Sequence, residues 1–66
     1  MRVFVNGETM EIAEPLKLHD LLTRLDMPAQ RIAVEVNRAV VRRQNWETTE
    51  IRDDDKIEIV HFVGGG

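Results

Sequence analysis

One leucine stripe between two prolines constrains the fold of this 66-residue chain more than any other feature. The four leucines of LHDLLTRL, residues 18–25, fall at i, i+3, i+4 and i+7, the spacing that places them on one face of a helix. Pro15 and Pro28 bound this helix, since proline cannot continue a helix and disfavours helical backbone in the residue before it. Lys17 occupies the N-cap position, where Ser, Thr, Asp or Asn would cap the helix, so the helix is predicted to be weakly capped at its start. The chain therefore has one amphipathic helix that needs a surface to cover.

Two short β-forming runs precede the helix. Residues 2–5 (RVFV) and 9–13 (TMEIA) flank Asn6-Gly7-Glu8. Asn-Gly is a strong signal for a hairpin turn, because both residues tolerate positive φ. The chain is therefore expected to open with a β-hairpin.

Further extended segments follow the helix. Apolar residues alternate over 32–36, which predicts a half-buried strand, and residues 40–41 begin another extended piece. Residues 42–52 show little periodicity, so we expect an irregular excursion pinned by Trp46 in the core. KIEIVHF, residues 56–62, is the last strand and carries apolar side chains on both faces, as a central strand does. The order favours an α+β β-grasp fold: a mixed sheet of four to five strands, its first and last strands parallel, with one main helix packed on one face.

Period-two counting divides the first and last strands between two faces. The residues assigned to the core beneath the helix are Val3, Val5, Ile57 and Ile59. The residues left on the open sheet face are Phe4, Val60 and Phe62. An exposed apolar patch is a candidate docking site for a partner. Two alternatives remain open at this stage: the 42–52 segment, or a second copy of the chain, could cover the patch.

Composition limits the class of protein. Sixty-six residues without cysteine make one small domain with no disulfide, thiolate metal site or cysteine nucleophile. A net charge of −3 argues against nucleic acid or an anionic membrane as partner, and a protein partner fits better. No apolar run approaches the ~20 residues of a membrane-spanning helix. The start, MRVFVNGE, lacks the apolar stretch of a secretion signal, so the expected location is cytoplasmic.

The remaining polar residues indicate no catalytic or metal site. His19 and His61 have no neighbours spaced as a triad or ligand set, and Asp53–Asp55 lacks calcium-loop spacing, which favours a solvated turn. Arg38, Arg42 and Arg43 could form a small basic face. Ordinary surface charge explains these arginines better than nucleic-acid binding does, and the functional alternative is a rim that pairs with an acidic partner.

The sequence closes on Gly64-Gly65-Gly66, which supplies neither core nor cap. We therefore expect a β-grasp domain over 1–63 and a flexible tail over 64–66. Adenylyl transfer from ATP would convert a carboxylate on such a tail into an acyl-adenylate that sulfur or nitrogen nucleophiles attack. Residues without Cβ are those that a narrow passage to ATP admits, so the tail suits presentation to an enzyme.

Taken together, these segments make the chain resemble the ThiS family of ubiquitin-like sulfur carriers in bacterial thiamin biosynthesis. The resemblance covers essentially residues 1–66 and rests on VNGE at 5–8, LHDLLTRL at 18–25, AVEVN at 33–37, VVRRQNW at 40–46, DDD at 53–55 and Gly65-Gly66. The family's turn usually reads Asp-Gly-Asp, and Asp54 at its centre is tolerable because aspartate enters left-handed backbone readily. Arg42, often proline in the family, and a third glycine at 64 are further departures, and none touches the reacting end.

The resemblance implies that Gly66 is adenylated and then thiocarboxylated, and that Gly64 and Gly65 thread into partner active sites. The chain would be a carrier rather than an enzyme, with no catalytic residues, no bound cofactor and no metal of its own, while the activating partner uses ATP. The implied partners are a ThiF-type adenylating enzyme, thiazole synthase (ThiG) and a sulfur donor such as a cysteine desulfurase persulfide.

The sequence leaves two alternative functions open. The small subunit of molybdopterin synthase shares the fold, the tail and the thiocarboxylate chemistry but is usually longer. A β-grasp interaction module that never reacts would carry the glycines as a mere tail.

Overall fold

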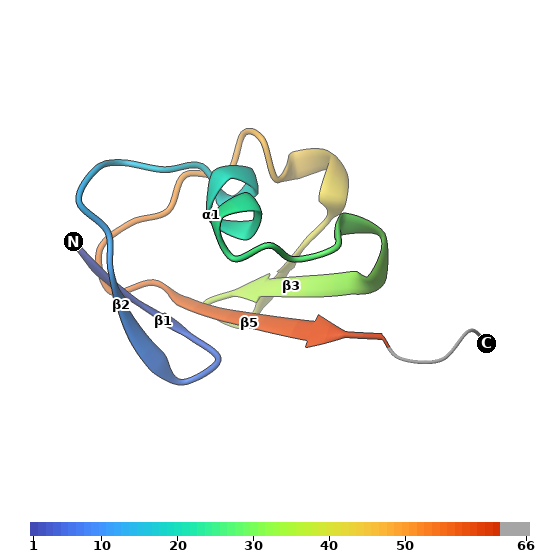
Figure 1. Cartoon of the computed structure of the whole chain (residues 1–66), viewed down its shortest axis with the longest axis horizontal. Coiled ribbons are helices and arrows are strands. Elements are labelled where there is room, and N and C mark those ends of the chain that lie inside the picture. The colour runs from blue at the N-terminus through green and yellow to red at the C-terminus, as the bar shows by residue number, and fades with distance from the viewer. Residues whose placement is uncertain (63–66) are drawn as a thin grey trace.

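The computed structural model describes residues 1–62 and forms one five-stranded sheet with a helix on one face (Figure 1). The elements are β1 (Arg2–Val5), β2 (Glu8–Glu11), α1 (Leu18–Arg24), the 3₁₀ helix η1 (Ala29–Arg31), β3 (Ile32–Val36), β4 (Ala39–Val41), the 3₁₀ helix η2 (Arg43–Asn45) and β5 (Lys56–His61). The sheet order is β2-β1-β5-β3-β4, with β1 and β5 parallel and the other neighbours antiparallel. The β-grasp prediction is confirmed.

The N-terminal hairpin turns over two residues rather than the expected three. Asn6 and Gly7 have φ of 49° and 85°, so the turn is complete after Gly7 and Glu8 already pairs with Val5. The second strand is therefore Glu8–Glu11, and the prediction of 9–13 was wrong at both ends. Just after β2, Ile12 still exchanges backbone hydrogen bonds with Met1, at 2.8 Å in each direction, and its side chain is buried in the core.

The β1–β5 pair is short, and a side chain lengthens it. The backbone register couples Phe4 with Lys56 and Val5 with Ile57. Beyond that register, Asn6 Oδ1 accepts the Ile59 N–H at 2.7 Å and Asn6 Nδ2 donates to the Ile59 carbonyl at 3.3 Å. The Asn6 amide thus replaces one peptide unit of the ladder between residues 53 positions apart.

The core lies between α1 and one sheet face, as the leucine stripe predicts. Its buried residues are Val3, Ile12, Leu16, Leu18, Leu21, Leu22, Ile32, Val34, Trp46, Ile51, Ile57 and Ile59, and Val5 and Leu25 pack against them half-buried. Trp46 is confirmed as a core residue, and its Nε1–H donates to the Val41 carbonyl at 2.9 Å. The core assignments of the first and last strands are confirmed.

The irregular segment before β5 supplies the cap that the helix sequence lacks. The Leu18 N–H donates to the Thr49 carbonyl at 2.7 Å, and the His19 N–H donates to the Trp46 carbonyl at 3.0 Å. The Asp20 carboxylate accepts the Lys17 N–H at 3.3 Å. The first donors of α1 are therefore satisfied by backbone carbonyls from a distant part of the chain.

The acidic turn before β5 is partly buried, which corrects the expectation of a solvated turn. Asp54 takes the left-handed conformation expected of it, with φ of 69°. Asp55 is buried, and its carboxylate accepts the Arg52 N–H at 2.8 Å and Asn37 Nδ2 at 2.9 Å. Asp55 is buried because its carboxylate joins the β3–β4 turn to the segment that leads into β5.

Replacing Leu22 by alanine tests the core. Leu22 is 3% exposed, so Leu22→Ala should lower the free energy of unfolding by ~2–5 kcal/mol, the cost of deleting a buried leucine side chain. Thermal and urea melts measure the loss. Val40→Ala, at a side chain 70% exposed, is the control and should cost less than about 1 kcal/mol. Equal losses in the two variants would contradict the packing described here.

Asn6→Asp tests the side-chain bridge between β1 and β5. Aspartate accepts the same backbone φ, but its carboxylate would face the Ile59 carbonyl without a donor. At pH 7 we expect a loss of about 1–3 kcal/mol in a urea titration, the usual cost of an unmet hydrogen bond. Asn45→Asp makes the same chemical change at an exposed residue whose side chain has no hydrogen bond within residues 1–62. A loss no larger at Asn6 than at Asn45 would show that the bridge is unimportant.

Candidate functional site

The sheet face opposite α1 is uncovered, and the strand registers define what lies on it. Its residues are Arg2, Phe4, Thr9, Glu11, Ala33, Glu35, Val40, Lys56, Glu58 and Val60, with Phe62 continuing the alternation just after β5. Val60 and Phe62 are each 55% exposed. The sequence therefore placed Phe4, Val60 and Phe62 on the correct face.

The three apolar residues do not form one patch. Val60 and Phe62 are two positions apart at the end of β5, whereas Phe4 lies beside Lys56 at its start. Val60 is four positions beyond Lys56 on β5, which is about 13 Å at the usual rise per residue. We call Val60 and Phe62 the exit patch, because they lie where the chain leaves β5.

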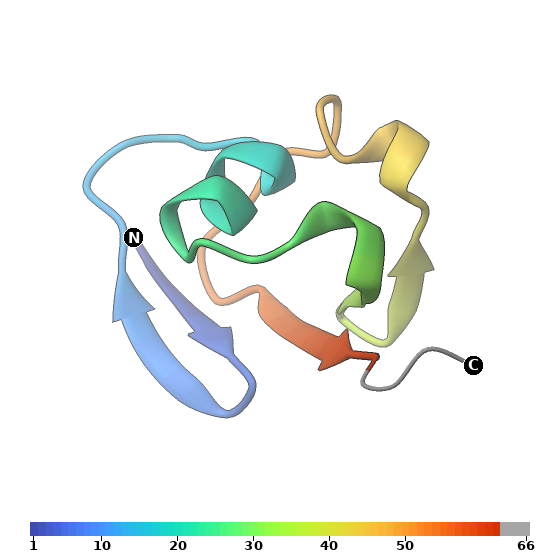
Figure 2. The ribbon, with the colours of Figure 1, turned by 45° about the vertical axis from the view of Figure 1, so that its right-hand side comes forward.

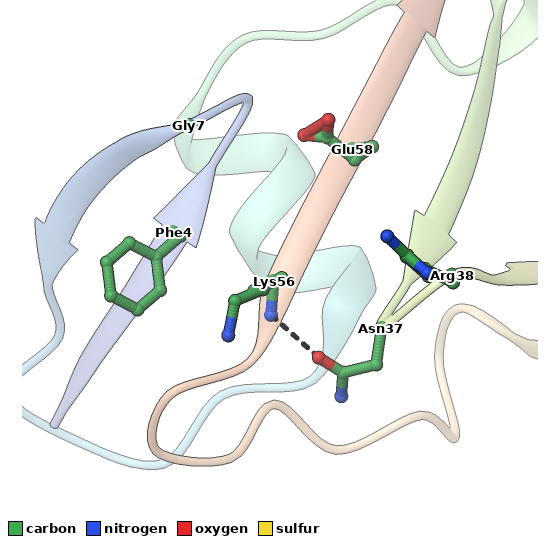
Figure 3. Close-up of a pocket in the computed structure, with 6 residues that line it drawn as sticks. All are labelled: Phe4, Gly7, Asn37, Arg38, Lys56 and Glu58. Atoms are coloured by element: carbon green, nitrogen blue, oxygen red, sulfur yellow. Dashed lines mark hydrogen bonds between the residues drawn. The ribbon is translucent and has the colours of Figure 1, made fainter.

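Phe4 belongs to a separate hollow on the same face. A pocket of about 440 Å³ is lined by Phe4, Gly7, Asn37, Arg38, Lys56 and Glu58 (Figure 3). The Phe4 ring is half-buried, with the Arg2 guanidinium 5.3 Å and the Lys56 ammonium 5.4 Å from its centroid. Both distances suit cation–π attraction, so the ring is already engaged within the fold.

The irregular segment does not cover the open face. Trp46 and Thr49 bond to the start of α1, so the 42–52 segment packs on the helix side of the sheet (Figure 1). This removes one of the two alternatives left open by the sequence. Val60 and Phe62 remain accessible in the single chain.

The end of β5 meets the start of β3 and the helix η1. Ile32 pairs with His61, and the Phe62 N–H donates to the Arg31 carbonyl at 2.7 Å. Figures 1 and 2 show η1 beside the last residues of β5. The chain therefore leaves the described fold next to Arg31.

The predicted basic face is rearranged by the β3–β4 hairpin. Arg38 lies in the turn at the far end of β3, whereas β4 carries Arg42 and Arg43 back toward the start of β3. Arg43 Nη1 donates to the Ala29 carbonyl at 3.4 Å, which places η2 against η1. The prediction that grouped Arg38 with Arg42 and Arg43 was wrong, since a hairpin turn and its strand ends lie at opposite ends of the sheet. Arg31 joins Arg42 and Arg43 in place of Arg38. The sequence did not identify Arg31, because only the pairing of β3 with β5 reveals its position.

Charge changes sign along the open face. Lys56 lies beside Phe4 at the start of β5, and Glu58 comes next with Glu35 directly opposite it on β3. Like charges directly opposed on a sheet are destabilising. The exit patch follows, and beyond it lie Arg31, Arg42 and Arg43. A partner would therefore meet cations at both ends of β5, beside Phe4 at its start and beside the exit patch at its end, with two carboxylates between them.

The described residues hold no group of three or more His, Cys, Asp or Glu side chains able to bind a metal. His19 and His61 are both exposed. No helix within residues 1–62 has the length and apolar character needed to cross a membrane. The predicted reacting residue, Gly66, and the predicted threading residues, Gly64 and Gly65, lie outside the described residues.

The fold and this face define a small ubiquitin-like β-grasp protein with an uncovered sheet surface. Its sequence matches the model of the ThiS family over residues 3–66. The chain belongs to the ThiS family.

Solved and curated relatives match the chain over nearly its whole length. The crystal structure of the thiamine biosynthesis protein ThiS from Geobacter metallireducens superposes with a TM-score of 0.87 at 35% identity and covers 100% of both chains. The uncharacterised protein ycf40 of Porphyra purpurea is 44% identical over 62 residues, covering 94% of this chain and 87% of that protein. The sulfur carrier protein ThiS of Escherichia coli is 29% identical over the full length of both chains.

A fourth relative is much longer. The thiazole synthase of Magnetococcus marinus is 39% identical over 66 residues, which is 100% of this chain but 20% of that protein. A ThiS-like sequence therefore occurs within a protein named thiazole synthase.

Aspartate substitutions at adjacent β5 residues test the two faces. Val60→Asp places a charge on the open face and should leave the melting temperature within a few degrees of the parent. Ile59→Asp makes the same kind of change under α1, where an unpaired charge costs several kcal/mol, and should unfold the domain. Circular dichroism melts compare the two variants. Unfolding by Val60→Asp would mean that this face is not open.

Proposed function

We propose that the chain is a sulfur carrier whose Gly66 carboxyl group is adenylated and converted to a thiocarboxylate, which supplies sulfur for the thiazole moiety of thiamin. Membership of the ThiS family over residues 3–66 is the observation that carries this proposal. The match extends through the terminal glycines, where the chemistry would occur. The chain acts here as a co-substrate of enzymes rather than as an enzyme.

The proposed chemistry needs only a free carboxylate and an accessible tail from this chain. The Gly66 carboxylate oxygen attacks the α-phosphorus of ATP, and pyrophosphate leaves. A persulfide sulfur then attacks the acyl carbon, the bond to AMP breaks, and an acyl disulfide forms. A second thiol reduces its S–S bond and releases the thiocarboxylate together with a new disulfide. The activating enzyme binds the ATP, so the carrier needs no cofactor of its own.

Three kinds of partner follow from the proposal. A ThiF-type enzyme performs the adenylation, a donor such as a cysteine desulfurase provides the persulfide, and thiazole synthase consumes the sulfur. The ThiS-like segment within the Magnetococcus marinus thiazole synthase supports the last assignment, since a shared chain holds two cooperating proteins at high effective concentration. The family match likewise favours thiazole synthase over molybdopterin synthase as the recipient.

The exit patch is the proposed contact for these partners. Val60 and Phe62 are exposed apolar side chains four or fewer residues from the glycines. A partner that grips them holds the tail close to its own active site, and Gly64 and Gly65 admit the chain to a narrow passage. Phe4, engaged by Arg2 and Lys56, would contact the same partner only at the edge of the interface.

Intact-protein mass spectrometry tests the function. With ATP, a ThiF-type enzyme and a sulfur source, the C-terminal peptide should show one oxygen replaced by sulfur. Adding one residue after Gly66, or replacing Gly65 by tryptophan, should abolish the change, because the reacting carboxylate is displaced or its passage is blocked. Supplying thiazole synthase and its other substrates should then yield a thiazole product.

Two comparisons make this experiment decisive. Val60→Asp should fold but react more slowly at low carrier concentration, since it weakens capture without altering Gly66. A ThiF-type enzyme proved active on another carrier serves as the positive control. If that enzyme leaves the parent chain unmodified, the sulfur-carrier proposal is wrong, and an inert β-grasp interaction module becomes the better account.

A further inference from the structure

The cations of this protein fall into two groups. Arg2, Lys17, Arg24 and Arg52 each have a carboxylate partner: Asp54, Glu50, Glu14 and Glu50 respectively. Lys56 lies over the Phe4 ring. Within residues 1–62, no carboxylate lies at ion-pair distance from Arg31, Arg38, Arg42 or Arg43. In the described part of the molecule, the arginines without a carboxylate partner thus all come from one stretch of the chain.

That stretch is poor in acid. Residues 27–46 contain four arginines and one acidic residue, Glu35, although the whole chain carries a net charge of −3. The rest of the molecule is therefore strongly acidic, and the positive charge is concentrated. An asymmetric distribution of this kind creates a directed field that a uniformly charged surface lacks.

The fold gathers three of these arginines where the chain leaves the sheet. Arg31 accepts the Phe62 N–H through its carbonyl, and Arg43 bonds to Ala29 of the same 3₁₀ helix. Arg42 follows β4 directly, one position beyond the pairing of Val41 with Val34. All three arginines are exposed. We call Arg31, Arg42 and Arg43 the exit arginines.

The exit arginines adjoin apolar surface as well as the chain exit. Val60 pairs with Ala33 on the neighbouring strand, and a groove of about 350 Å³ along β4 is lined by Ala33, Val40, Arg42 and Arg43 among others. Protein interfaces combine an apolar centre with a charged rim. Guanidinium groups bind carboxylates in two-point contacts, which suits a rim of Asp and Glu.

We propose that the exit arginines dock on a carboxylate-rich rim around the passage through which the adenylating enzyme receives the tail. This inference rests on the proposed function and identifies the chemistry of the partner surface. A protein rim fits better than nucleic acid, because Glu35, Glu58 and the acidic remainder of the chain repel a polyanion. The rim charges act on encounter and orientation, while Gly66 alone reacts.

Carrier-dependent exchange between ATP and pyrophosphate tests the inference. The ThiF-type enzyme from the same organism is assayed with the parent chain, R42E/R43E and R52E over a range of sodium chloride concentrations. R42E/R43E should raise the KM for the carrier about tenfold or more at low salt, as loss of electrostatic steering does. Its kcat should stay within about twofold, and its KM should depend less on salt than that of the parent chain, because rim charges govern encounter rather than the chemical step.

R52E is the matched control. Arg52 is exposed, precedes β5 at the opposite end from the exit, and has only a 4.0 Å surface pair to lose. The R52E protein should keep its KM within about twofold of the parent, since an exposed ion pair contributes little. If R42E/R43E melts well below the parent chain, R42A/R43A replaces it, with a smaller expected increase in KM.

The remaining outcomes separate this inference from the function. If R42E/R43E and R52E show equal KM values while the parent chain supports exchange, the docking inference is wrong and the carrier function stands. A fall in kcat at constant KM also overturns the docking role. Exchange absent with the parent chain, given an enzyme active on another carrier, overturns both. Tight binding of a DNA duplex at physiological salt, lost in R42E/R43E, would replace the protein rim by nucleic acid.

Discussion

The parallel contact between the first and last strands is the constraint on which the rest of the structure depends. The two hairpins, β1–β2 and β3–β4, are local, but neither offers α1 a surface wide enough to cover. Only when β5 enters between β1 and β3 do Val3, Val34 and Ile57 form a continuous floor under the leucines. Two backbone register pairs and the Asn6 amide hold this contact over 53 residues of sequence. Asn6 therefore has two roles, since its positive φ makes the hairpin turn and its side chain continues the sheet.

A central β5 also determines where the chain emerges and what surrounds it. β5 is flanked by β1 and β3 along its first residues, but beyond Ile59 it has strand partners only on β3, so its last residues extend past the N-terminal hairpin (Figure 2). The alternation that buries Ile57 and Ile59 necessarily turns Val60 and Phe62 to the open face. The same pairing with β3 brings η1 and its arginine alongside. The register between β3 and β5 thus determines both the packing of the core and which residues surround the end of β5.

Sequence reasoning succeeded where the relevant pattern is local. Period-two alternation assigned both faces of β5, the leucine spacing found α1, and Asn6-Gly7 located the first turn. It failed where the answer depends on register between distant segments. The cap of α1 comes from the carbonyls of Trp46 and Thr49, and the burial of Asp55 comes from the Asn37 amide. Neither contact has a signal in the residues beside it. The separation of Arg38 from Arg42 has the same cause, since sequence proximity across a hairpin says nothing of which sheet end each residue occupies.

The order of chemistry along β5 bears on how a carrier could be held in one orientation. A purely apolar patch gives adhesion but little direction, because hydrophobic attraction is non-directional. Here the series runs from Lys56 through the opposed Glu58 and Glu35 to Val60 and then to the exit arginines. If the carrier is turned end for end on a partner complementary to this series, Glu58 and Glu35 meet the partner's apolar surface and Val60 meets the partner's cations, so charges are desolvated without a counter-charge. Opposing Glu35 to Glu58 costs some stability, and a contribution of these two carboxylates to orientation on the partner would explain that cost. The order of charged and apolar residues along the central strand would therefore orient the carrier on such a partner, which an apolar patch alone could not do.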